Sequence, residues 1–217
     1  MALSKPGRRT IFLTTIIIAA PVLLAVTITA FKNKFEKLPV YGEKGLEATG
    51  AQTAHTIQPF SLKNQDEKIF TQNDLNNKIT VADFFFTSCL SVCPKMTAHL
   101  KPVAEAFKND TDVAIISISV DPETDTPQRL RWYTRQSGIV TGQWNFLTGD
   151  KQQIYKLARK SFFLTASDGD GGPNDFIHSD KIILVDSKKN IRGYYNGTNP
   201  GEIQQLITDI RKLEKEN

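Results

Sequence analysis

Cysteine, histidine, methionine and tryptophan are scarce in this chain of 217 residues, which contains two, three, two and two of them respectively. Two cysteines are too few for the disulfide framework of a small secreted scaffold, and a close pair is more typical of a redox or metal site. The basic residues form no dense patch and the net charge is only +4, which argues against nucleic-acid binding. Hydrophobic residues make up 40% of the chain, so a folded globular domain is expected.

One segment near the N-terminus lacks charge altogether. Residues 11–31 consist mainly of Ile, Leu, Val, Ala and Thr, and about 20 apolar residues suffice to span a bilayer as a helix. We therefore predict a short cytoplasmic N-terminus at 1–10 and a single transmembrane anchor at 11–31. A cleaved secretory signal is the alternative, although its apolar region would be unusually long.

The expected location follows from this segment. The apolar run begins at about residue 11, which leaves no room before it for a long arginine-rich mitochondrial presequence. A single-pass protein of the bacterial inner (cytoplasmic) membrane, with its soluble domain on the periplasmic side, is the simpler interpretation. Residues 32–58 contain Pro39, several glycines and mixed charge, and we interpret them as a linker that holds the domain off the membrane.

From residue 59 to residue 217 the chain alternates between strand-like and helix-like segments. Buried strands are predicted at 79–86 and 113–120, a short strand at 144–147, and hairpins at 60–70 and 181–196. Helices are predicted at 94–107, 126–137, 150–160 and 201–216. This order predicts an α/β fold. A thiol pair at the first strand-to-helix turn makes a thioredoxin-like domain the natural choice.

The thiol pair is Cys89 and Cys93, which follow an apolar run and precede Pro94. The free N–H groups and the dipole at a helix N-terminus stabilise a thiolate and lower the cysteine pKa. Thiolate is the form that binds metal or attacks a disulfide. Spacing alone leaves three uses open: a permanent structural disulfide, a soft-metal site, or a redox pair.

Histidine could complete a metal site. His99 falls close to the apolar stripe of the helix predicted at 94–107, so we interpret it as structural, and His55 as a solvated linker residue. His178 ends a glycine-rich loop directly before the strand at 181–186, and that loop is expected to pack against the cysteine turn. Two thiolates and one imidazole would suit Cu(I), whereas a structural zinc site would require a fourth ligand.

Three aspartates lie near the predicted site. Strand alternation puts Asp83 on the face of Phe85, where burial would raise its pKa and allow proton exchange with Cys93. The alternative is a partly solvated, locally bonded carboxyl. Asp121 and Asp125 follow the second buried strand, and we expect turn formation and capping there, with Asp121 kept as a possible neighbour of the site.

These motifs resemble the Sco (SenC/PrrC) family. The resemblance is carried by the run Phe86–Pro94, by the segment Asp121–Pro127 and by the pair His178-Ser179 before a strand. It implies a membrane-tethered thioredoxin-like domain that binds copper, as Cu(I) and/or Cu(II), through Cys89, Cys93 and His178. Three departures stand out: Leu90 replaces a proline that many members have, Asp83 occupies a position that is usually not acidic, and the loop at 166–175 is glycine-rich, so that the position of His178 is expected to depend on metal.

The resemblance also implies a function and partners. Such a protein delivers copper to, or reduces, the dinuclear copper centre in subunit II of cytochrome c oxidase, and it interacts with a thiol reductant or a copper donor protein. The prediction is therefore a metallochaperone with thiol-redox chemistry. The alternative is a thiol-disulfide oxidoreductase of thioredoxin type without copper delivery, which would need the cysteines but not His178. A peroxide-reducing enzyme is disfavoured because the usual upstream proline is absent.

Overall fold

The computed structural model describes residues 37–42, 55–164 and 179–216, with 19–21, 23–24 and the main chain of 45–46 and 52–53. The predicted glycine-rich loop, His178 and nearly all of the candidate membrane span lie outside these residues. Among the described residues, no helix is long and apolar enough to cross a membrane. A compact unit extends over Leu38–Asn217.

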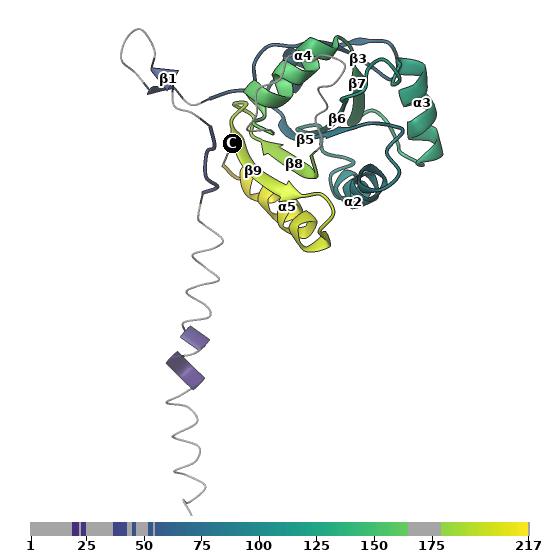
Figure 1. The fold of residues 1–217 in the computed structure, drawn as a ribbon. Coiled ribbons are helices and arrows are strands. Elements are labelled where there is room, and N and C mark those ends of the chain that lie inside the picture. Colours follow the sequence, from purple (N-terminus) through teal and green to yellow (C-terminus); the bar gives the residue numbers. More distant parts are fainter. Residues whose placement is uncertain are drawn as a thin grey trace, which may run out of the picture. The chain divides into compact units, whose positions relative to one another are not determined.

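A twisted sheet forms the centre of this unit (Figure 1). Its strands are β3 (Ser61–Asn64), β4 (Ile69–Thr71), β5 (Ile79–Phe85), β6 (Val113–Ser119), β7 (Trp144–Thr148), β8 (Lys181–Val185) and β9 (Ile191–Asn196). Their order is β4-β3-β7-β6-β5-β8-β9. β5 runs parallel to β6, and β6 parallel to β7, whereas β8 is antiparallel to β5. β1 (Gly45–Leu46) pairs separately with β2 (Gln52–Thr53).

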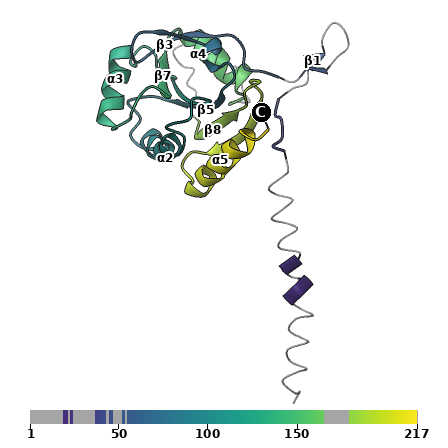
Figure 2. The same cartoon turned by 180° about the vertical axis from the view of Figure 1, so that it is seen from behind.

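Helices cover both faces of the sheet. They are α2 (Val92–Ala106), α3 (Pro127–Gln136), α4 (Lys151–Lys156) and α5 (Pro200–Leu213), with the 3₁₀ turn η1 (Gln72–Leu75) and the π-helical turn η2 (Leu157–Ser161). Both side views place α2 and α5 below the strands and α4 above them (Figures 1 and 2). This is the three-layer α/β arrangement predicted from the order of the elements.

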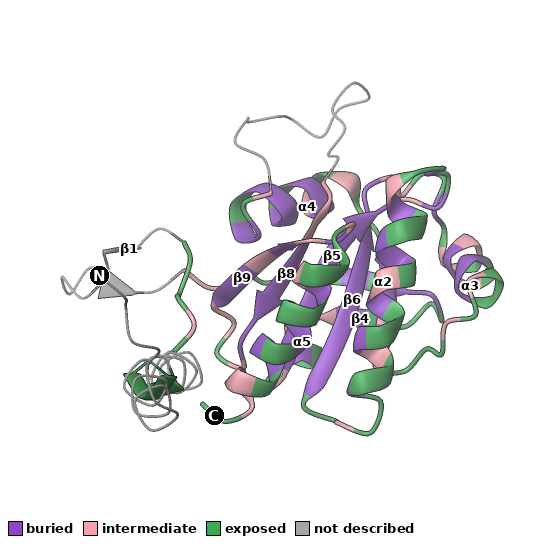
Figure 3. Ribbon diagram, turned by 90° about the horizontal axis from the view of Figure 1, so that it is seen from below, coloured by how far each residue is buried: buried purple, intermediate pink, exposed green. Residues whose placement is uncertain are grey.

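The sheet separates two apolar clusters. The cluster under α2, α3 and α5 contains both cysteines, Met96, Leu100 and Leu206, while the other packs around α4 and η2. Every residue of β5 and β6 is buried (Figure 3), as expected for central strands that are covered on both faces. The cysteine turn therefore starts from the end of a strand, β5, that is buried along its whole length.

Three predicted helices differ in detail from the observed ones, and one of them, α5, ends at Leu213 rather than at residue 216. α2 begins at Val92 rather than Pro94, because a proline fits any position of a first turn, where its missing N–H would be unpaired in any case. The helix predicted at 150–160 changes after Lys156 into the π-helical turn η2. Cys93 thus lies inside the first turn of α2 rather than before it.

Part of the predicted linker is packed on the domain. The guanidinium of Arg192, on β9, donates hydrogen bonds to the carbonyl oxygens of Leu38 (2.7 Å) and Pro39 (3.1 Å), and Tyr41 N donates to Ile191 O at 2.8 Å. Ile57 is buried. The domain boundary at residue 59 stays a prediction. Residues 38–42 and 55–58, which are predicted to belong to the linker, lie within the compact unit.

Candidate metal centre

The cysteine turn joins the end of β5 to the start of α2. Cys89 N donates to Phe86 O at 3.3 Å, which closes a tight turn. Cys93 N, in the first turn of α2, donates to Cys89 Sγ at 3.3 Å. Neither cysteine is in a disulfide, so the structure shows the dithiol form. The helix N-terminus therefore directs one of its free N–H groups at the first sulfur.

Both thiols are shielded from solvent to different degrees. Cys89 is 8% exposed and Cys93 is 4% exposed, and both join the apolar cluster beneath α2. Leu90, which follows Cys89 directly, is 96% exposed. The turn thus presents an apolar side chain to solvent beside a sulfur that lies just under the surface.

The surroundings shift the two thiol pKa values in opposite directions. Burial by itself raises the pKa of Cys89, but hydrogen bonds from the backbone of Cys93, Ser91 and Val92 and from the Cys93 side chain outweigh it, and the pKa falls below its usual value. Burial raises the pKa of Cys93 to about 12, and the nearby Cys89 and Asp83 add to this effect. Cys89 is therefore the thiol that ionises first.

Asp83 lies on β5 beneath the turn. It is 2% exposed, so it is not the partly solvated carboxyl of the alternative interpretation. Ser117 Oγ donates to Asp83 Oδ1 at 2.5 Å, and Trp144 Nε1 donates to Ser117 Oγ at 2.9 Å. Burial raises the Asp83 pKa to about 7, although the bond from Ser117 opposes the shift. Proton exchange between Asp83 and Cys93 stays a prediction.

Asp121 and Asp125 behave differently. Asp121 is partly exposed, and its carbonyl accepts hydrogen bonds from Thr124 N and Asp125 N, so the contribution that the structure shows is a backbone turn. Asp125 is fully buried, and its carboxyl group bonds the main chain and the hydroxyl of Thr87, two residues before Cys89. Asp125 rather than Asp121 reaches the cysteine turn.

The described histidines have structural partners. His99 Nδ1 lies 2.8 Å from Gly197 O, in agreement with a structural role. His55 Nε2 lies 3.0 Å from Ser161 O, and its ring lies against Phe163, so the expectation of a solvated linker residue is wrong. Within the described ranges, no group of three or more Cys, His, Asp or Glu side chains is arranged to hold a metal ion. The predicted ligand His178 lies outside those ranges.

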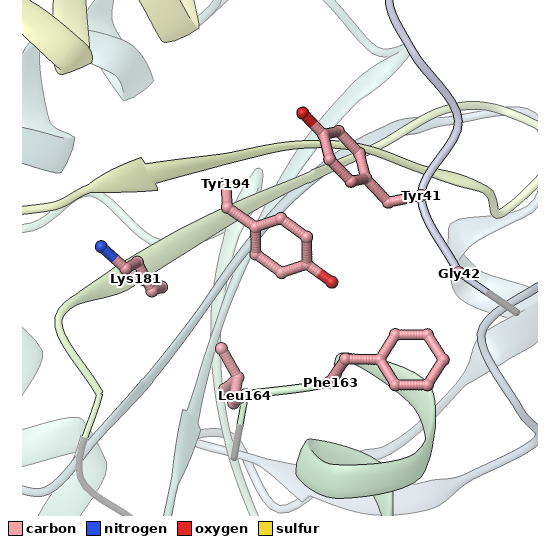
Figure 4. Close-up of a pocket in the computed structure, with 6 residues that line it drawn as sticks. All are labelled: Tyr41, Gly42, Phe163, Leu164, Lys181 and Tyr194. Atoms are coloured by element: carbon pink, nitrogen blue, oxygen red, sulfur yellow. The ribbon is translucent and has the colours of Figure 1, made fainter. Parts of the chain in front are cut away.

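A pocket of about 490 Å³ is lined by none of the cysteines or their turn, and Figure 4 shows its lining residues. Its lining includes Tyr41, Tyr194 and Lys181, and Tyr194 packs against the apolar cluster on the α4 side of the sheet. The cysteines belong to the opposite cluster. The pocket therefore adjoins the cluster that does not contain the cysteines.

Comparison with known proteins decides between the families that share such a thiol turn. The SCO1/SenC family model matches residues 48–215. The chain belongs to the SCO1/SenC family. A curated relative, the SCO1 protein homolog of Bacillus subtilis, is 34% identical over 159 residues, which cover 72% of this chain and 82% of the relative.

Solved structures of Sco proteins agree with the fold. The structure of BsSco, described as a member of the Sco family of cytochrome c oxidase assembly proteins with a disulfide switch, is 32% identical with a TM-score of 0.65, covering 75% of this chain and 95% of BsSco. Copper-bound ScoI of Bradyrhizobium japonicum is 29% identical with a TM-score of 0.57, covering 71% and 98% of the two chains. This Sco family member thus has the thioredoxin-like fold predicted from its sequence.

Proposed function

We propose that this Sco family member binds copper as cargo and acts in the assembly of cytochrome c oxidase, as a copper chaperone and thiol-redox factor for the dinuclear copper centre of subunit II. The carrying observation is the pair of reduced thiols at the start of α2, with Cys93 N bonded to Cys89 Sγ. Thiolate is a soft ligand that favours Cu(I). The copper-bound relative ScoI supports the same assignment.

The proposed ligand set is Cys89, Cys93 and His178. Cys89 has the lower thiol pKa and would lose its proton first, and Cys93, whose pKa is about 12, would lose its proton to the metal only on binding. Because a metal must displace that proton, copper binding should release protons and should weaken as the pH falls. A site with ligands on two separate segments of the chain can bind copper and also release it.

The setting of the domain belongs to the same proposal. We place it on the periplasmic side of a bacterial inner membrane, tethered by a helix at 11–31. Its partners would be subunit II of the oxidase and a thiol reductant or copper donor protein. The relatives support membrane association in general terms, since a structurally similar Sco protein from Bacillus anthracis is described as a lipoprotein.

A thiol-disulfide reductase is the second candidate. It is favoured by the opposite pKa shifts of the two thiols, because an ionised Cys89 can attack a substrate disulfide and Cys93 can then resolve the mixed disulfide. In this exchange the substrate disulfide becomes two thiols while Cys89 and Cys93 become one disulfide. The reductase needs the cysteines only, whereas copper delivery also needs the imidazole.

His178→Ala separates the two functions. In a strain that lacks the native gene, the variant should abolish oxidase assembly while the purified protein keeps its disulfide reductase rate. His99→Ala, which removes a histidine bonded to Gly197 O, is the matched control and should support assembly. If His178→Ala assembled the oxidase as well as the parent does, copper delivery through this residue would be refuted and the reductase would become the better assignment.

A further inference from the structure

A buried polar network lies beneath the cysteine turn, beyond the ends of the paired strands. Asp125 is fully buried, and its carboxyl group accepts hydrogen bonds from Thr87 N (3.0 Å), from the Thr87 hydroxyl and from Ser119 Oγ (2.6 Å). Thr87 follows β5 and Ser119 ends β6. One carboxyl group thus ties the outgoing chain of β5 to the end of the neighbouring strand.

Arg129 joins this network from the surface. Its Nε donates to Thr87 Oγ1 at 3.0 Å, and its guanidinium lies 4.2 Å over the ring of Trp132, which is about half exposed. The Thr87 hydroxyl therefore accepts from Arg129 while it donates to Asp125. A threonine hydroxyl has one hydrogen to donate and can also accept, so both roles are filled at once.

The position of Thr87 in the cysteine turn links the network to Cys89. The bond from Cys89 N to Phe86 O closes a four-residue turn, and Thr87 is the first of its two central residues. Fixing Thr87 therefore fixes the main chain that carries Cys89, whose sulfur must meet the Cys93 N–H at 3.3 Å. β5 and β6 are already paired along seven residues each, so the fold itself has other support.

We propose that Arg129 and Asp125 are positioning residues that hold Thr87, and through it set the orientation of Cys89 toward the first turn of α2. Neither residue touches the sulfurs in the structure. They act on the reactivity of the thiol pair through the turn. The inference concerns the same cysteines as the proposed function, but it applies to their thiol chemistry whether or not copper is the cargo.

The test measures thiol chemistry in the full-length protein in detergent, without copper. The first readout is the rate at which iodoacetamide alkylates Cys89, a substitution in which the thiolate displaces iodide. The second is the equilibrium with glutathione, in which Cys89 and Cys93 form a disulfide while glutathione disulfide is reduced to two glutathione thiols. A residue that only stabilised the fold would not shift this equilibrium.

Thr87→Val and Arg129→Met should each slow the alkylation about fivefold and shift the glutathione equilibrium about fivefold toward the disulfide, as expected for the loss of one hydrogen bond that supports the reduced form. Thr87→Ser keeps the hydroxyl and should restore both values. Arg135→Met changes an exposed arginine of the same helix and should match the parent. Urea unfolding of each variant identifies any that fails to fold. If Thr87→Val fails to fold, Arg129→Met still tests the proposal, because it alters a partly exposed side chain.

Parental values in both Thr87→Val and Arg129→Met would overturn the proposal, as would equal losses in Thr87→Val and Thr87→Ser. Since no copper is present, failure of the copper assignment would leave these results unchanged. The copper assignment and the positioning role of Arg129 and Asp125 can therefore be refuted independently.

Discussion

At the scale of single residues, the two thiols differ because their surroundings differ and not because of their sequence spacing. Cys89 receives an N–H from the first turn of α2, whereas Cys93 is less exposed, at 4% against 8% for Cys89, and burial raises its pKa. The sequence predicted that a helix N-terminus would lower a thiol pKa, but it could not assign the effect to one sulfur. That assignment depends on where α2 starts, which Pro94 left uncertain by two residues.

Asp83 is the residue whose environment has the clearest pH consequence. Its pKa rises from 3.8 to about 7 on folding, so the folded state holds a proton that the unfolded chain releases as the pH rises from about 4 to about 7. The contribution of Asp83 to the free energy of unfolding should fall over that interval by about 4 kcal/mol, at ~1.4 kcal/mol per pKa unit.

Asp83→Asn should flatten this fall, because an amide does not titrate. Urea unfolding of parent and variant at pH 4 and pH 8 measures it, with Asp112→Asn, which removes an exposed carboxyl, as the control. A variant whose stability still falls like that of the parent would contradict the assignment. In the same protein, an unchanged rate of disulfide reduction in Asp83→Asn would remove the proton-exchange role.

At the scale of elements, local patterns predicted nearly every strand and helix, and pairings between distant residues escaped prediction. Thr126 before Pro127 correctly marked the start of α3. The π-helical turn η2 was not foreseen, since such a turn has no propensity signal of its own. Likewise, Asp125 was expected to shape its own turn, but its partner Thr87 is 38 residues away, a separation that a single sequence does not reveal.

The start of α4 allows a test of capping. The side chain of Asp150 accepts a hydrogen bond from Gln153 N at 2.7 Å. Asp150→Ala should lower the free energy of unfolding by about 1 kcal/mol, and Asp150→Asn, which can still cap, by only about a few tenths. Urea unfolding distinguishes the two variants. Equal losses would show that charge rather than the cap hydrogen bond stabilises this end.

At the scale of the whole molecule, one buried arginine connects three parts of the chain that are remote in sequence. The Arg192 guanidinium pairs with Asp186 Oδ2 (3.0 Å) and Glu216 Oε2 (2.8 Å), and its side chain is 8% exposed. The same group donates to the carbonyls of Leu38 and Pro39. It thereby holds the carbonyls of Leu38 and Pro39 beside β9 and beside Glu216, which follows α5.

Arg192→Met should destabilise the domain by about 3 kcal/mol or more, because it leaves a buried acidic partner without its cation. It should also make residues 38–42 more accessible to proteases, since Leu38 O and Pro39 O lose their donor. Urea unfolding and limited proteolysis measure these effects, and Arg135→Met is the exposed control. Stability and cleavage equal to those of the control would show that Arg192 does not hold the segment.

The most direct test of the account is an anaerobic Cu(I) titration of the fully reduced full-length protein beside its His178→Ala and His99→Ala variants. A three-ligand site should bind one copper per chain, equally tightly in the parent and His99→Ala and at least about tenfold more weakly in His178→Ala, a difference of ~1.4 kcal/mol. Weak binding by the parent that does not change in His178→Ala would contradict a three-ligand copper site and would leave Cys89 and Cys93 as a redox pair.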